Sequence, residues 1–204
     1  MNNPLSLAIL IAIFGICQFP RNAFAQAEST ENVTALTLFT PGLSYEKSTS
    51  RSQSLRLHAY MSPSFSFAYS SSLGTESKFW LDPAIDLQYR FYYNFRKRLE
   101  KKARVEKNSA NFIAIETGTY FSKKQVSDNY FEEASRRPVN HLALLWGLQR
   151  NMPGRFSLNF SAGAGFSWTR STTQLPTGEK ATITSNRFIL PVDMGIGIWL
   201  GKLR

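Results

Sequence analysis

Cysteine is almost missing from this chain, since Cys17 is the only one among its 204 residues. Everything after residue 17 therefore lacks disulfide frameworks, thiolate metal sites and cysteine nucleophiles. Histidine is nearly as scarce, with only His58 and His141. The sequence has no spacing typical of a metal site, a phosphate-binding glycine loop or a nucleotide site. It therefore predicts no metal and no cofactor.

Long hydrophobic runs are absent beyond the N-terminus. Residues Leu5 to Phe19 form an apolar run that is short for a membrane span, and Ala23-Phe24-Ala25 after it has the small-x-small pattern of a cleavage site. We expect residues 1–25 to be a signal peptide and residues 26–204 to form one domain. No Lys or Arg precedes the run, which leaves an uncleaved anchor as the alternative. No later segment has the ~20 consecutive apolar residues that a spanning helix needs.

Acidic residues are few: 14 Asp and Glu against 24 Lys and Arg give a formal charge of +10. Such a balance is typical of proteins that bind nucleic acid or an anionic membrane surface. An export signal argues against nucleic acid, and the strand pattern described below leads us to expect outer-membrane lipids as the partners. Much of the charge lies in one segment, which contains Arg96, Lys97, Arg98, Lys101, Lys102, Arg104 and Lys107. This segment is either a solvated periplasmic turn or a contact for lipid headgroups or an acidic periplasmic partner.

A strict alternation of side-chain type is the strongest pattern present. In "FWLDPAIDLQYRFYYNF" (79–95) every odd position is apolar or aromatic, whereas most even positions carry a polar group. Successive side chains of a strand point to opposite faces, so this alternation predicts a two-faced strand. Segments with the same or a weaker alternation are 54–69, 111–121, 141–149, 156–168 and 187–201.

Two further segments, 33–39 and 42–47, bring the predicted strand count to eight. If one long strand passes through Pro41 instead, the count is odd. Short connections at 46–53 and 151–155 contrast with longer polar loops, as in outer-membrane barrels with short periplasmic turns. We therefore predict an all-β protein, an eight-stranded antiparallel up-and-down transmembrane β-barrel in the bacterial outer membrane.

The volume of a small barrel indicates which face meets lipid. Eight strands enclose only enough space for side chains to fill, so the many Phe, Leu, Tyr and Trp residues would overfill the interior. The other face is rich in Ser, Gly and Ala, which fit a narrow interior. A soluble protein would instead carry interspersed Lys and Glu outside. We expect the apolar face to point outward.

Four stretches carry a resemblance that covers the chain after the leader: "TPGLSYE", "DPAIDLQYRFYYN", "WGLQRNMPGRFSLNFSAGAGFSW" and "GIGIWLGK". Together with the export signal they resemble small bacterial outer-membrane β-barrel families. That resemblance implies an eight-stranded barrel with no settled activity.

The alternation also predicts which polar residues face the interior: Glu46, Arg56, His58, Asp82, Asp86, Arg90, Glu116, Arg187 and Asp193. Charges of both signs in a confined space must be paired or solvated. The first hypothesis is a structural or surface-interaction barrel filled by an ion-pair network. The second is a narrow channel or a small-ligand pocket.

A lipid-modifying enzyme is a third hypothesis. Acyl transfer would use a serine nucleophile and a histidine base, and His58 shares its face with Ser62 and Ser64. Because serines are common in this chain, we expect no catalysis. The loop 123–139 mixes aromatic and charged residues and is a candidate for binding an extracellular partner. The oligomeric state is left open.

Overall fold

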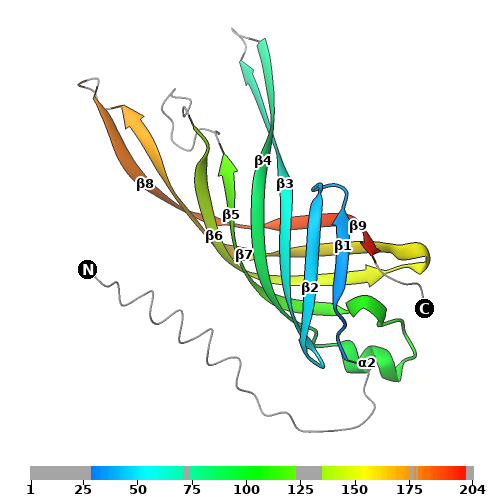
Figure 1. Cartoon of the computed structure of the whole chain (residues 1–204). Helices are drawn as coiled ribbons and strands as arrows, with labels where there is room; N and C mark the ends of the chain where they lie inside the picture. The colour runs from blue at the N-terminus through cyan, green and yellow to red at the C-terminus, as the bar shows by residue number, and fades with distance from the viewer. Residues whose placement is uncertain (1–28, 71–73, 123–134, 175–176, 178, 201–204) are drawn as a thin grey trace, which may run out of the picture.

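The computed structural model of the chain describes residues 29–70, 74–122, 135–174, 177 and 179–200 (Figure 1). The predicted signal peptide and most of the loop 123–139 lie outside these residues. Among the described residues, no helix has the length and apolar content needed to cross a membrane.

In the part of the chain that the structure describes, nine antiparallel strands form one sheet whose ends meet, so that the strands stand in a ring. The all-β, antiparallel part of the prediction is confirmed. Neighbours along the chain pair with each other from β1 to β7, and β1 also pairs with β9, which pairs with β7. The strands are β1 (Val33–Thr37), β2 (Gly42–Ser50), β3 (Gln53–Ser70), β4 (Gly74–Phe91), β5 (Asn111–Ser122), β6 (Arg137–Asn151), β7 (Phe156–Gln174), β8 (Lys180–Ile189) and β9 (Val192–Leu200).

The predicted count of eight strands is wrong because the last predicted strand is interrupted. β8 and β9 follow one another along β7, with Ile189 opposite Gly165 and Val192 opposite Ala162. Between them lies Pro191, which has no N–H to donate to a ladder. Its carbonyl still accepts a hydrogen bond from the Gly163 amide at 3.0 Å. The proline therefore divides one path along β7 into two strands.

Large apolar side chains lie on the outer face of the ring. In β6, Leu142, Leu144 and Trp146 are 47%, 59% and 43% exposed, whereas Ala143 and Leu145 between them are buried. The same alternation occurs in β3, β4, β5 and β9. Polar and charged side chains, rather than a continuous apolar core, occupy much of the interior. This is the reverse of the usual arrangement in a soluble domain.

The connection between β4 and β5, residues 92–110, covers one end of the ring (Figure 1). It contains α2 (Phe95–Glu100) and the 3₁₀ turn η2 (Glu106–Asn108); a second 3₁₀ turn, η3 (Pro153–Arg155), joins β6 to β7. Phe95 and Leu99 lie one helical turn apart and pack on the same apolar cluster. The other members are Tyr92, Val105, Ala110, Phe112, Ala114, Ala143 and Leu145.

Phe95 corrects one sequence expectation. The alternation from residue 79 places it on the outer face, but β4 ends at Phe91 and α2 begins at Phe95. Period-two alternation has no meaning in a helix, and Phe95 is buried in the interior cluster. By contrast, Phe91 and Tyr93 are exposed on the outside near the same end of the ring.

Candidate functional site

Glu46 is the central acceptor of a buried polar layer inside the ring. Its Oε1 accepts hydrogen bonds from Ser54 Oγ at 2.5 Å, Tyr92 Oη at 2.6 Å and Asn108 Nδ2 at 2.8 Å. Its Oε2 lies 3.6 Å from Arg90 Nη1. Burial, followed by the Glu46 carboxylate, raises the pKa of Tyr92 well above its usual range, so this hydroxyl remains a donor.

Arg90 connects this layer to the far side of the ring. Its Nε donates to Gln88 Oε1 at 2.7 Å, and its Nη1 donates to Gln149 Oε1 at 2.8 Å. The guanidinium carbon lies 4.2 Å from the centre of the Phe112 ring, a cation–π distance. Arg90 is only 1% exposed. Its side chain therefore lies between the apolar cluster at the capped end and the rest of the interior of the ring.

The basic segment, which was predicted as a turn, folds into a cap over one end of the ring. Asn108 reaches Glu46 and also donates to the Glu31 carbonyl at 3.0 Å, while the Lys107 carbonyl accepts from Gln149 Nε2 at 2.8 Å. Lys107 Nζ forms an ion pair with Glu31 at 2.6 Å. Exposed basic residues are Arg96, Lys97, Lys101 and Lys102, and half-buried ones are Arg98, Arg104 and Lys107.

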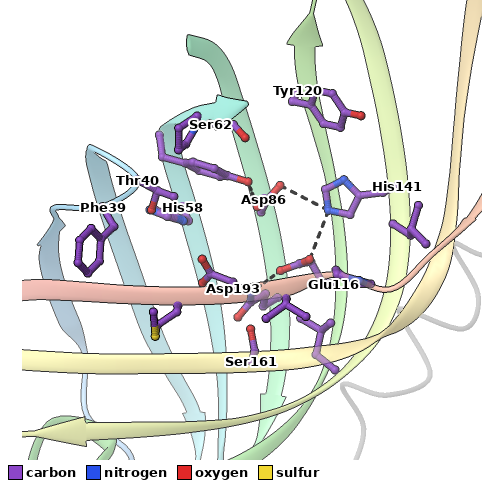
Figure 2. Close-up of a pocket in the computed structure, with 18 of the residues that line it drawn as sticks. Phe39, Thr40, His58, Ser62, Asp86, Glu116, Tyr120, His141, Ser161 and Asp193 are labelled. Atoms are coloured by element: carbon purple, nitrogen blue, oxygen red, sulfur yellow. Dashed lines mark hydrogen bonds and ion pairs between the residues drawn. The ribbon is translucent and has the colours of Figure 1, made fainter. Parts of the chain in front are cut away.

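Above the polar layer lies a cavity of about 440 Å³ (Figure 2). Its wall combines residues of β3 to β7 with Pro191 and the start of β9. Titratable side chains in the wall are His58, Tyr60, Asp86, Glu116, Tyr120, His141 and Asp193. His58 stacks on Tyr60, with ring centres 4.3 Å apart, and its Nε2 lies 3.0 Å from Thr37 Oγ1. Gln88 belongs to both the wall and the polar layer.

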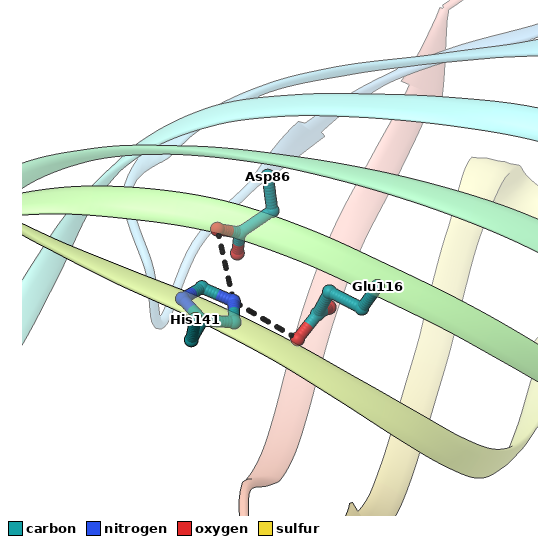
Figure 3. Close-up of side chains that lie close together, drawn as sticks. All are labelled: Asp86, Glu116 and His141. Carbon is teal, nitrogen blue, oxygen red and sulfur yellow. Dashed lines mark ion pairs between the residues drawn. The ribbon is translucent and has the colours of Figure 1, made fainter. Parts of the chain in front are cut away.

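Strand register brings Asp86, Glu116 and His141 together (Figure 3). Asp86 of β4 is opposite Gly118 of β5, which is opposite His141 of β6. Glu116 lies two residues from Gly118 and therefore on the same face. His141 Nε2 is 3.3 Å from Glu116 Oε1 and 3.6 Å from Asp86 Oδ1.

Gly118 provides the space in which these side chains meet. A Cβ atom at this position would overlap Asp86 Oδ1 and would lie 2.6 Å from His141 Cε1. Both approaches are far closer than a van der Waals contact. A side chain at position 118 would therefore displace the carboxylate or the imidazole.

The second oxygen of each carboxylate has its own donor. Tyr60 Oη donates to Asp86 Oδ2 at 2.6 Å, and Gln88 Nε2 donates to Glu116 Oε2. One oxygen of each carboxylate thus accepts a hydrogen bond, while the other oxygen faces His141. This arrangement can bind a proton or a cation between the three groups.

The structure separates the predicted interior residues into groups. Those that are buried are Glu46, Arg56, His58, Asp82, Asp86, Arg90 and Glu116. Asp193 is half-buried in the cavity wall. Arg187 is exposed and lies opposite Ser167, another residue of the wall. Glu46 and Arg90 meet in the polar layer, whereas Asp86 and Glu116 meet in the cavity.

His141 belongs to the candidate site but was not among the predicted interior residues. A signal was present, since His141 and Gln149 are both polar and share one face of the strand predicted from 141 to 149. Its partnership with Asp86 and Glu116 depends on the register of three strands, which the sequence does not reveal.

Comparison with family models, curated proteins and solved structures finds no match to this chain.

Proposed function

We propose that this chain is a small outer-membrane β-barrel, exported through a cleaved signal peptide, whose interior binds a small polar ligand. The observation that carries the proposal is the reversed burial pattern. Large apolar side chains cover the outside of the ring, while charged ones such as Glu46, Arg90 and Asp86 are buried inside. In a barrel that crosses a membrane, the outward positions contact lipid and the inward positions line a polar interior.

Aromatic side chains near the strand ends support the same proposal. Phe91 and Tyr93 are exposed beside the capped end of the ring, while Phe79 and Trp168 are exposed nearer the opposite ends of β4 and β7. Aromatic residues gather at both interfaces of membrane barrels. The exposed basic side chains of the cap would then face lipid headgroups or the periplasm, where they attract anionic groups.

The interior favours binding over a purely structural role or conduction. An ion-pair network that fills the whole barrel is the simplest expectation, but the buried layer around Glu46 and Arg90 occupies only part of the interior. The cavity above it has titratable side chains and enough room for a small ligand. Below it, the apolar cluster around Phe112 and the cap fill the end of the ring. This closed end supports a binding pocket rather than a channel.

Heat-modifiability tests the membrane part of the proposal. The protein in a purified outer-membrane fraction is expected to run at different positions on a detergent gel before and after boiling, because a closed barrel stays folded in detergent. It is also expected to resist extraction with carbonate. A protein that shows no shift and appears in the soluble periplasmic fraction would contradict the proposal. The apolar face would then have to be covered by something other than lipid.

A further inference from the structure

We propose that Asp86, Glu116 and His141 form a binding site for a divalent transition-metal ion of the Zn²⁺ class. The inference deepens the proposed function, because it identifies the ligand of the interior cavity and rests on that cavity being a binding site. The three side chains come from β4, β5 and β6 and converge at one point of the cavity wall (Figure 3). One nitrogen and two carboxylate oxygens, all within 4.8 Å of one another, are offered to an ion.

The spacing of these atoms suits a tetrahedral ion. Ligand atoms ~2.1 Å from Zn²⁺ lie ~3.4 Å apart when the geometry is tetrahedral. The His141 nitrogen is 3.3 Å and 3.6 Å from the nearest oxygens of Glu116 and Asp86. The two carboxylate oxygens lie within 4.8 Å of each other, so a movement that brings them closer together would complete three of four positions. The fourth would face the cavity and take water or another small ligand, as in sites that keep an open position.

Asp86 gives independent support. Its Oδ1 is buried and accepts no hydrogen bond from any residue that the structure describes, and the residue as a whole is only 7% exposed. The nearest ion-pair partner of this oxygen, His141 Nε2, is 3.6 Å away, beyond hydrogen-bond distance, and a buried carboxylate oxygen without a donor is costly because it has lost its hydration. This is the oxygen that faces His141. A bound cation would supply the missing partner.

Hydrogen bonds from neighbouring side chains hold the two carboxylates in place, as is usual for the ligands of a metal. Tyr60 donates to the far oxygen of Asp86, and Gln88 donates to the far oxygen of Glu116. Such contacts orient the ligands of a metal before it binds, and they change its affinity when they are removed. Gly118 keeps the site open, since any Cβ there would occupy the position of Asp86 Oδ1.

The donor set selects the class of ion. Imidazole nitrogen together with carboxylate oxygen suits Zn²⁺ and its neighbours, whereas Mg²⁺ and Ca²⁺ prefer sites made of oxygen alone. Two carboxylates and a neutral imidazole carry a charge of −2, which a divalent cation neutralises. The competing explanation is a protonated His141 that pairs with both carboxylates and leaves no room for a metal. The experiment below separates the two.

The test is a calorimetric titration of the full, metal-free chain in detergent micelles with ZnCl₂. We expect one Zn²⁺ per chain, and each of Asp86→Asn, Glu116→Gln and His141→Gln should weaken binding by at least ~100-fold. Tyr60→Phe should weaken it by ~10-fold, the lower end of the range for an outer contact. Glu100→Gln, the same chemical change at an exposed residue of α2, is the matched control and should bind like the unmodified chain.

Every protein in this series is also checked for heat-modifiability, so that the two proposals fail separately. A chain that shows the shift but binds no Zn²⁺, or whose three ligand variants all bind as well as the parent, would overturn the metal site and leave the barrel. A chain without the shift would overturn the membrane proposal whatever its metal binding. Should a ligand variant fail to fold, Gly118→Ala keeps all three donors but displaces them, and it should lose binding too.

Discussion

Replacing Glu46 by alanine is expected to lower the free energy of unfolding by about 3–5 kcal/mol, the usual cost of removing one partner of a buried ion pair. Arg90 would keep its charge in a site where it is 1% exposed. Three donors, from Ser54, Tyr92 and Asn108, would lose their common acceptor. Asn108 of the cap also contacts the strands through Glu46, so the loss of this hydrogen bond would destabilise the capped end of the ring. Urea unfolding in micelles, followed by tryptophan fluorescence, measures the change.

Two further variants control this prediction. Glu100 forms an exposed i,i+4 pair with Arg96 on α2. Glu100→Ala should change stability by no more than about 0.5 kcal/mol, because such pairs contribute little. The double variant Glu46→Leu with Arg90→Met removes both charges and should be more stable than Glu46→Ala. A loss below about 1 kcal/mol for Glu46→Ala would mean that the buried layer does not stabilise the ring.

Leu144→Arg should cost about 2–4 kcal/mol when the protein is folded in lipid vesicles, as expected for a charge facing the middle of a bilayer. Leu144 is 59% exposed and lies near the centre of β6, with Leu142 and Trp146 on the same face. In water, an exposed leucine can be replaced by arginine at almost no cost, because surface substitutions rarely change stability by more than about 0.5 kcal/mol. Urea titration of the protein in vesicles measures the difference.

Thr49→Arg is the matched control for this substitution. Thr49 is exposed near the end of β2, beside the turn into β3 and away from the middle of the ring. Because the cost of a charge falls toward zero at the membrane interface, this variant should lose at most about 1 kcal/mol. Equal and small effects of both substitutions would argue against lipid contact at Leu144.

The faces of the strands were predictable from the sequence because they depend only on local alternation. Asp82, Asp86 and Arg90 share one parity in a strand, and all three are buried. The positions of the strands in the chain were largely predictable for the same reason. The interruption at Pro191 was also within reach, since proline cannot donate to a ladder. The predicted strand from 187 to 201 passed over it.

The interior sites depend on contacts that a single sequence does not encode locally. Phe95 continues the alternation of β4 in sequence, yet its burial follows from the start of a six-residue helix. Asn108 reaches Glu46 across 62 positions of the chain. His141 meets Asp86 only because β5 stands between their strands in one particular register. A shift of that register by one residue would turn His141 or Asp86 to the other face.

The central claim is that the apolar outer face of the ring contacts lipid, and spin labels along β6 test it most directly. No cysteine follows residue 17, so single cysteines at positions 142 to 146 can each carry one label in the protein folded in vesicles. Lipid contact predicts that labels at 142, 144 and 146 collide often with oxygen, which concentrates in the bilayer, and rarely with a water-soluble nickel complex. Labels at 143 and 145 should be protected from both. Frequent collisions with the nickel complex at 142, 144 and 146 would show that this face meets water and would contradict the membrane barrel.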